Sequence, residues 1–273
     1  IKQIGFKDIT PYEVLQQAKD TTRCIHIAYI AEGYTKDEMQ TFLNDAKIAN
    51  DAIFEHEPFK TLKSKFNVIA VMSPSKESGC SIPSKGIWKK TALNSHFDTF
   101  YSDRYLTTLN LKDMHDILAG TPYEHIIVLV NTDRYGGGGI LNSYNLSMTH
   151  HNKFRPVVVH EFGHSFAGLA DEYAYETEDL AMYPHDIEPW ERNITTMVDF
   201  HGKWENMIEE KTEIPTPATP ENINKVGVYE GAGYSIHGVY RGQQDCRMRT
   251  NENPEFCKIC QKAITDVINF YTE

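Results

Sequence analysis

The most constraining feature of this sequence is the apolar run HIIVLVNT at residues 125–132. Its apolar residues follow one another without polar alternation, which is typical of a strand buried on both faces of a sheet. CIHIAYIAEG (24–33) and FNVIAVMS (66–73) also predict strands. Between them, TKDEMQTFLNDAKIANDAIFE predicts a long amphipathic helix that begins at a capping box of Thr35 and Glu38. The first half of the chain is therefore expected to be of the α/β type.

Four further segments carry weaker signals. TPYEVLQQA (10–18) predicts a helix, because Thr10 and Glu13 have the spacing of a capping box and Pro11 suits the first helical position. LKDMHDILAG (111–120) predicts a short helix, and GGILNSYNLSM (138–148) a further strand. A closing helix is expected to begin at Pro254. From Ala174 to Asn253 no long helical period appears, so this region is expected to be irregular.

The charge balance argues against a nucleic-acid partner. The chain has 273 residues, with 27 Lys and Arg against 38 Asp and Glu, and a formal charge of −11, whereas nucleic-acid binding requires a basic face. A membrane span is not expected, because no run of about 18 apolar residues exists. The chain begins at Ile1 rather than Met. We interpret this as processing or trimming, so the lack of a leader does not argue for the cytoplasm.

The stretch VVVHEFGHSFAGLADEY (157–173) contains the residues with the clearest chemistry. On a helix, His160 and His164 lie one turn apart on the same face and can present both imidazoles to one ion. Glu161 is then placed to contact a water on that ion rather than the ion itself. This is the H-E-x-x-H arrangement of zinc peptidases, in which the glutamate acts as general base.

A catalytic zinc needs a third protein ligand, which is expected soon after this helix. Gly168 can end the helix by adopting a positive φ, after which the chain turns back to present an acidic residue. In the metzincin superfamily the glycine follows the second histidine by three residues, and the third ligand follows the glycine by three. Here Gly168 is four residues after His164, and Asp171 is three after the glycine. We therefore predict Asp171 as the third ligand.

Met248, just before the closing helix, is predicted to form the methionine turn that lies beneath the zinc in metzincins. Met197 and Met207 precede no such element. Tyr234 and Tyr240 lie upstream of this turn, where a hydroxyl could donate to a tetrahedral intermediate. For both tyrosines we favour packing or surface roles.

The four glycines in YGGGGIL need a separate explanation. They lack the lysine and the spacing of a phosphate-binding loop. We interpret Gly137, Gly138 and Gly139 as a strand rim whose bare backbone lets a substrate strand approach, or as a structural bulge.

Three of the five cysteines, Cys246, Cys257 and Cys260, lie within 15 residues. A structural zinc needs four ligands, and only three cysteines are available here. We therefore favour a disulfide from Cys246 to either Cys257 or Cys260, which would pin the methionine turn to the closing helix.

Together these motifs resemble one family, the bacterial IgA-peptidase family of metallopeptidases, also called igalysins. The resemblance runs from Ala31 almost to the end of the chain and is most specific in the zinc stretch and the cysteine blocks. The matching blocks are AEGYT (31–35), FNVIAV (66–71), RYLTT (104–108), NTDRYGGGGI (131–140), VVVHEFGHSFAGLADEY (157–173), EPWERNIT (188–195), GVYEGAGY (227–234), DCRMR (245–249) and FCKICQ (256–261).

The resemblance implies an α+β, metzincin-like zincin fold with a twisted mixed sheet, an active-site helix, an irregular C-terminal subdomain and a closing helix. It implies one catalytic domain over residues 1–273, with an upper subdomain of about 1–170 and a lower one of about 171–273. It also implies an exported endopeptidase with one Zn²⁺ per chain, in which zinc-bound water activated by Glu161 attacks a peptide or protein substrate. It does not imply that this substrate is IgA.

Two other functions stay open at this point. A non-catalytic protein could hold a peptide or glycan on a peptidase-like fold, although Glu161 and both histidines are intact. A thermolysin-like zincin would take its third ligand from Glu188 or Glu191. Within the zinc stretch itself, Glu172 is the nearest alternative to Asp171.

Overall fold

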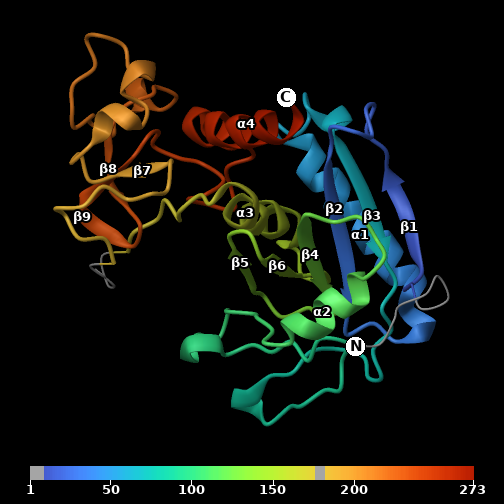
Figure 1. Ribbon diagram of the computed structural model, residues 1–273. Helices are drawn as coiled ribbons and strands as arrows, with labels where there is room; N and C mark the ends of the chain where they lie inside the picture. Colours follow the sequence, from blue (N-terminus) through green and yellow to red (C-terminus); the bar gives the residue numbers. More distant parts are fainter. Residues whose placement is uncertain (1–8, 176–181) are drawn as a thin grey trace. The chain divides into compact units, whose positions relative to one another are not determined.

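The computed structural model describes residues 9–175 and 182–273, which group into two compact units (Figure 1). We call them the sheet unit and the C-terminal unit. The sheet unit comprises Ile1–Glu55, Phe59–Phe166 and Ile268–Glu273, and the C-terminal unit comprises His56–Pro58 and Ala167–Val267.

A twisted mixed sheet forms the centre of the sheet unit, with the strand order β1-β3-β2-β4-β6-β5 among the described residues. The inner strands pair in parallel, whereas β1 and β5, the first and last in this order, are antiparallel to their neighbours. The predicted mixed sheet is confirmed. The strands are β1 (Tyr12–Gln16), β2 (Ile25–Glu32), β3 (Phe66–Val71), β4 (His125–Val130), β5 (Gly137–Ile140) and β6 (Tyr144–Met148).

Helices α1 (Met39–Glu55) and α3 (Phe154–Ala167) pack on one face of this sheet. There the ring of Phe66 in β3 lies 5.2 Å from that of Phe54 in α1 and 6.1 Å from that of Phe166 in α3. Strand β4 is buried along its whole length, as its continuous apolar run predicts.

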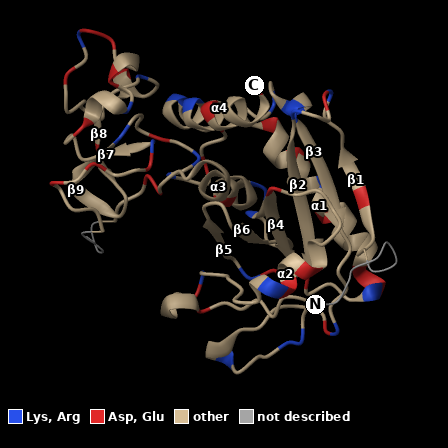
Figure 2. Cartoon of the chain, in the orientation of Figure 1, with Lys and Arg blue, Asp and Glu red and all other residues tan. Residues whose placement is uncertain are grey.

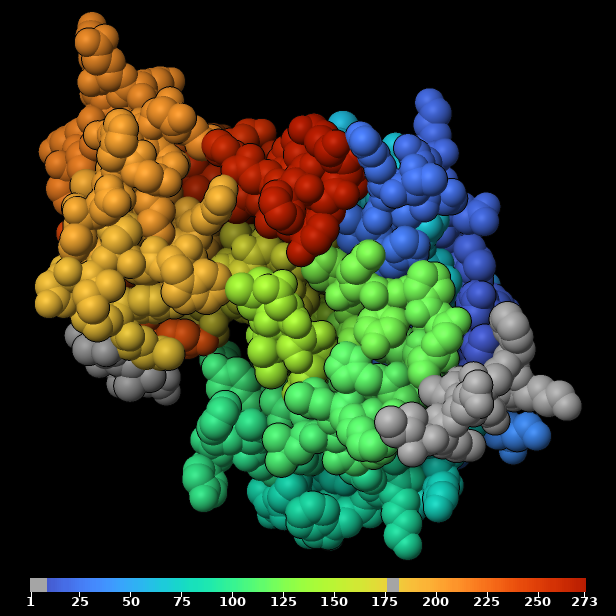
Figure 3. Space-filling view, in the orientation of Figure 1, coloured from blue at the N-terminus to red at the C-terminus, as the bar shows by residue number. Residues whose placement is uncertain are grey.

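The opposite face of the sheet is covered by α2 (Leu111–Leu118) and by the irregular segment between β3 and α2. Met114 and Leu118 of α2, with Leu93, Phe97 and Leu106 of that segment, form one apolar cluster with alternate strand residues. The same segment, coloured cyan to green, makes up much of the lower surface in Figure 3.

Two predicted elements are wrong in kind. The segment 10–18 forms strand β1 rather than a helix, and Tyr12 and Val14 pair with Val71 and Ile69 of β3. A short isolated helix is only marginally stable, whereas β3 offers a row of backbone partners. The segment 138–148 is a hairpin of β5 and β6 rather than one strand, and Asn142 in its turn has a φ of 55°.

The C-terminal unit contains a small antiparallel sheet in the order β7-β9-β8 and the larger part of one long helix, up to Val267. Ala170, Ile194, Ala232 and Val239 form its apolar cluster. The rest of the described part of 174–253 is irregular apart from short 3₁₀ turns, as predicted. The elements are β7 (Ile194–Thr195), β8 (Tyr229–Ala232), β9 (Ser235–Arg241) and α4 (Lys258–Thr272).

The closing helix begins at Lys258, four residues later than the predicted start at Pro254. The intervening backbone makes other contacts: the amide of Arg247 donates to the carbonyl of Glu255, and the amide of Cys257 donates to Sγ of Cys246. These contacts hold the chain out of the helical path until Lys258.

Acidic and basic residues alternate along the chain in both units (Figure 2). Among the described residues, no helix combines the length and the apolar character that crossing a bilayer requires.

Candidate active site

Helix α3 is buried over most of its surface, and His160, Glu161 and His164 are half-buried on one side of it. Phe162 and Phe166 lie on the other side, since residues two apart on a helix point in nearly opposite directions. Their rings lie 5.3 and 5.5 Å from the buried ring of Phe59. Aromatic packing therefore fixes the rotation of the helix and the direction in which the polar side chains point.

His125 of β4 completes the packing behind this helix. Its ring lies 4.6 Å from that of Phe166, and the side chain is buried. Because burial removes water from the charged imidazolium, the pKa of His125 falls to about 4. This histidine is a neutral packing residue at ordinary pH.

The two histidines of the motif converge as their spacing predicts. Nε2 of His160 lies 3.0 Å from Nε2 of His164. A tetrahedral ion with Zn–N bonds of about 2.0–2.1 Å would set two such nitrogens about 3.3 Å apart. The pair therefore fits a shared zinc ion closely.

Strand β5 passes close to the side of α3 that carries Glu161 and His164, which leaves room only for glycine at two of its positions. A Cβ on Gly137 would lie 2.8 Å from Oε1 of Glu161, and one on Gly139 would lie 2.5 Å from the backbone oxygen of Glu161 and 2.9 Å from Cβ of His164. Neither glycine has a positive φ. Space, rather than backbone conformation, is therefore what these two positions require.

Gly138 faces the other way, where an added Cβ would lie 2.8 Å from the carbonyl oxygen of Leu106. The carbonyl of Gly137 accepts a hydrogen bond of 3.2 Å from the amide of Leu106, so the start of β5 is paired on that side. Strand β5 is the last in the order of the sheet. The predicted rim is thus an edge strand packed beside the helix of the H-E-x-x-H motif.

The predicted end of this helix is confirmed, since α3 ends at Ala167 and Gly168 has a φ of 60°. Asp171 follows Gly168 by three residues and lies in the part of the C-terminal unit that comes directly after this helix. The hydroxyl of Tyr234 donates a hydrogen bond to Oδ2 of Asp171.

Backbone contacts also hold this segment. The amide of Gly233 donates to the carbonyl of Asp171 at 2.9 Å. The side chain of Asn193 accepts from the amide of Ala170 and donates to its carbonyl, at 2.8 and 2.9 Å. Sequence reasoning missed the roles of Asn193 and Tyr234, although both lie in blocks that match the family.

Glu172, the alternative to Asp171, is directed elsewhere. It is fully buried, its Oε1 accepts from Nδ2 of Asn193 at 3.0 Å, and its carboxylate lies beside cysteine side chains. Its amide donates to the carbonyl of Met248 at 2.8 Å. Met248 is buried in a turn over residues 247–249, as predicted for its local structure.

A family model described as IgA Peptidase M64 matches the chain over residues 14–225 and 219–268. The chain belongs to the IgA peptidase M64 family. This confirms the resemblance seen in the motifs and makes the protein a metallopeptidase, which acts on peptides or proteins and uses a metal, usually zinc. The match covers both units.

Other comparisons add less. A search of curated proteins found no match to the sequence. Among solved structures, archaemetzincin from Methanopyrus kandleri is similar at 10% sequence identity, over 92% of this chain and 99% of that chain, with a TM-score of 0.38.

The two distant glutamates of the peptidase are engaged in holding loops of the C-terminal unit. Oε2 of Glu188 accepts hydrogen bonds of 3.1 Å from the amides of Val198 and Asp199. Oε1 of Glu191 accepts a hydrogen bond of 2.9 Å from the hydroxyl of Tyr183. These contacts give both carboxylates structural roles.

The predicted disulfide is wrong, because all five cysteines of the peptidase are free thiols. Sγ of Cys246 lies 3.7 Å from Sγ of Cys260, too far for a bond between them. The three clustered cysteines share their surroundings with Glu172, which sequence spacing alone did not bring to them.

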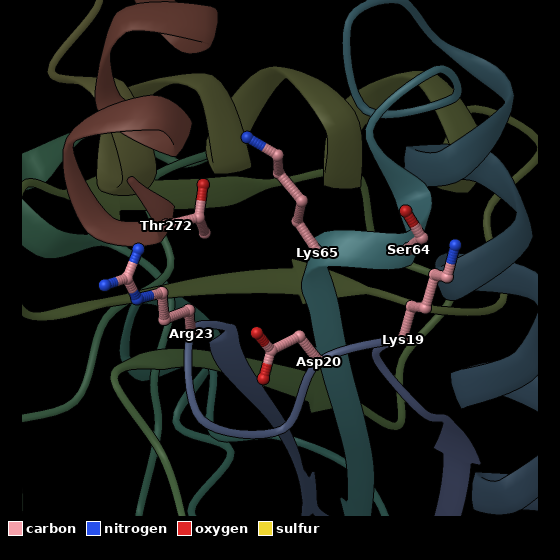
Figure 4. Close-up of a pocket in the computed structure, with 6 residues that line it drawn as sticks. All are labelled: Lys19, Asp20, Arg23, Ser64, Lys65 and Thr272. Atoms are coloured by element: carbon pink, nitrogen blue, oxygen red, sulfur yellow. The ribbon is translucent and has the colours of Figure 1, made fainter.

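A pocket in the sheet unit has a different character (Figure 4). It is lined by Lys19, Asp20, Arg23, Ser64, Lys65 and Thr272. Its basic groups are spread around the rim, and two of them bind the last residues of the chain, with Arg23 donating to the carbonyl of Glu273 and Lys65 to Oδ1 of Asn269. Nothing in its lining suits peptide hydrolysis.

Proposed function

We propose that this chain is a zinc-dependent endopeptidase in which His160, His164 and Asp171 hold the metal and Glu161 is the general base. The observation that carries the proposal is the 3.0 Å approach of the two Nε2 atoms on the half-buried side of an otherwise buried helix. Family membership supports the general class. The ligand set and the steps below are inferred from the residues.

When bound at these residues, zinc would lower the pKa of a water and polarise the scissile carbonyl. The carboxylate of Glu161 takes the proton from the attacking water and delivers it to the leaving amine. Gly137 leaves the space that this carboxylate occupies. The hydroxyl of Tyr234 orients Asp171, as groups behind a metal ligand commonly do.

Strand β5 is the element we assign to substrate binding. An extended peptide can add to the edge of a sheet through backbone hydrogen bonds. We place such a strand at the outer edge of β5 beyond Gly137, whose carbonyl already pairs with Leu106, because Gly139 brings that edge close to α3. An internal stretch of a longer chain can lie in this way, which favours endopeptidase activity. Export from the cell stays a prediction from the family resemblance.

The test is cleavage of a diverse peptide pool read by mass spectrometry, comparing the wild type with Glu161→Gln. Loss of general-base catalysis should lower the rate by about 10²–10⁴-fold, while zinc content stays unchanged. Unchanged cleavage in this variant would exclude Glu161 as the base. If the zinc-loaded wild type yields no products, the result favours a latent or very narrow protease, or the binding alternative, over a general endopeptidase.

The third ligand is tested with matched carboxamide variants. Asp171→Asn should lower the affinity of the histidine site for zinc, and Glu188→Gln, the control, should not. The thermolysin-like alternative predicts the reverse. Competition with a chromogenic chelator measures both.

A further inference from the structure

Four buried groups converge in the C-terminal unit, apart from the histidine motif. They are the side chains of Glu172, Cys246, Cys257 and Cys260, which are 0%, 0%, 5% and 0% exposed. Their ligand atoms lie within 4.8 Å of one another. They come from three separate segments: the stretch after α3, the methionine turn and the start of α4. Buried thiols can serve as packing residues, but a buried carboxylate among them needs a compensating partner.

We propose that Glu172, Cys246, Cys257 and Cys260 bind a second zinc ion, which has a structural role. This site does not depend on the proposed peptidase mechanism. It raises the expected metal content above the one zinc ion per chain that the family resemblance implies.

The distances between the four groups fit a tetrahedron around one ion. Zn–S bonds of about 2.3 Å and a Zn–O bond of about 2.1 Å require S–S edges of about 3.8 Å and S–O edges of about 3.6 Å. Sγ of Cys246 lies 3.7 Å from Sγ of Cys260. Oε1 of Glu172 lies 3.1 Å from Sγ of Cys260 and 3.8 Å from Sγ of Cys257.

An unpartnered carboxylate oxygen is independent evidence for a ligand. Oε2 of Glu172 is buried and has no hydrogen-bond partner among the described residues. A buried polar atom of this kind costs free energy unless something compensates it, and a cation does so directly. Asn193 donates to Oε1, the oxygen nearest the sulfur atoms, and an ion at Oε1 would also offset the charge that the same carboxylate carries on Oε2.

Two of the three sulfur atoms, those of Cys246 and Cys257, accept hydrogen bonds from the backbone. The amides of Met248 and Cys257 donate to Sγ of Cys246, at 3.4 and 3.1 Å. The amide of Cys260 donates to Sγ of Cys257 at 3.5 Å. Donors directed at sulfur favour the thiolate, which is the form that binds metal.

Charge balance is consistent with a divalent ion. Three thiolates and one carboxylate carry a charge of −4, and zinc offsets half of it. Two buried arginines, Arg241 and Arg247, interact electrostatically with Glu172 and Cys246 respectively. The ion and these two arginines would together bring the cluster to neutrality.

The ion would organise the backbone around the proposed active site. Glu172 directly follows Asp171, and Cys246 lies two residues before Met248. Binding all four ligands therefore ties the segment of Asp171 and the methionine turn to the start of α4. We assign the ion this clamping role rather than a catalytic one, because four protein ligands leave no open position.

The experiment separates the two sites in the full chain. In His160→Ala/His164→Ala, elemental analysis should show a fall from about two zinc ions per chain to about one. X-ray absorption of the remaining ion should show sulfur neighbours at about 2.3 Å. Retention of this zinc supports the second site even if the proposed catalytic site fails.

A second measurement tests the four proposed ligands in the folded protein without mutating any of them. Titration of this double variant with an organomercurial should release the remaining zinc as three thiols react, and a metallochromic dye reports the release. Cys80→Ser, which replaces a buried cysteine outside the cluster, is the matched control. Before titration it should contain as much zinc as the double variant, and the organomercurial should release that zinc in the same way. A double variant without zinc, or a disulfide between Cys246 and Cys260 in the native protein, would overturn the proposal.

Discussion

Replacing Gly137 with alanine should reduce activity while leaving stability close to that of the wild type. The new Cβ would lie 2.8 Å from Oε1, 3.0 Å from Cγ and 3.1 Å from Cδ of Glu161. Carbon contacts are comfortable from about 3.5 Å, so the carboxylate must move by about 0.4–0.7 Å. Because these atoms end a flexible side chain and Gly137 has no positive φ, the backbone can stay in place.

The consequence falls on catalysis. A misplacement of about 1 Å can cost about 100-fold in rate, so we expect kcat/KM to fall about 10–100-fold. That corresponds to about 1.4–2.7 kcal/mol of transition-state stabilisation. Zinc content should stay unchanged, because no atom of either histidine is among the three nearest to the new methyl group.

Gly139→Ala is the informative contrast. Its Cβ would lie 2.5 Å from the backbone oxygen of Glu161 and 2.9 Å from Cβ of His164, and neither atom can rotate away. Strand β5 and helix α3 would have to separate, and overpacking of this kind costs about 1–3 kcal/mol. At about 2–4 °C per kcal/mol for a chain of this size, Tm should fall by about 2–12 °C.

The assay compares kcat/KM on a cleaved peptide with Tm from calorimetry. Gly202→Ala is the control, because nothing lies within 4 Å of its added Cβ. If Gly137→Ala kept wild-type kcat/KM, or lost activity only together with Tm or zinc, then Gly137 would not serve to leave room for the base.

Three further perturbations test other parts of the structure. Because burial lowers the pKa of His125 from 6.5 to about 4, the unfolded chain binds this proton first and stability falls as pH drops from 6.5 to 4. The loss in the free energy of unfolding is at most about 3 kcal/mol. Urea unfolding should show that this free energy depends less on pH in His125→Gln than in the wild type. An equal pH dependence in both would contradict the low pKa of His125. Glu32→Ala removes a buried acceptor for Thr91 Oγ1 and the amides of Leu93 and Ser95, at 2.5, 2.7 and 2.8 Å. It should lower the free energy of unfolding by about 2–4 kcal/mol, whereas a loss below 1 kcal/mol would mean that water replaces the carboxylate. Tyr234→Phe removes the donor to Asp171 and should weaken zinc binding about 10-fold in chelator competition, with Tyr240→Phe as control; equal affinities would show that the hydroxyl does not orient the ligand.

Periodicity predicted those elements whose burial pattern is strong. Strand β4 and helices α1 and α3 are recognisable because their apolar residues report which faces are covered. Strand β1 is not, because its first three residues are exposed and its identity depends on a partner more than 50 residues away. The capping-box spacing of Thr10 and Glu13 predicts a helix, but pairing with β3 makes this segment a strand.

The histidine motif was predictable for a related reason. His160, Glu161 and His164 lie within two turns of one helix, so sequence spacing sets their geometry directly. Asn193, Tyr234 and the cysteine cluster depend on contacts across 21 to 88 residues, which no local pattern encodes. The fourth group beside the three cysteines, Glu172, belongs to the stretch 157–173, so the spacing of the cysteines did not indicate it.

The dipeptide of Asp171 and Glu172 shows why the two acidic neighbours are not interchangeable. After Gly168 the chain is neither helical nor turned, and successive side chains of such a segment point to opposite sides. The carboxylate of Glu172 therefore faces the cysteines, and that of Asp171 points the other way. The extra residue between His164 and Gly168 leaves this alternation intact, because the step from glycine to ligand is kept. Inserting one residue after Gly168 should exchange the directions of the two carboxylates, so the register of this segment, more than the identity of either acid, sets which of the two proposed metal sites each one can serve.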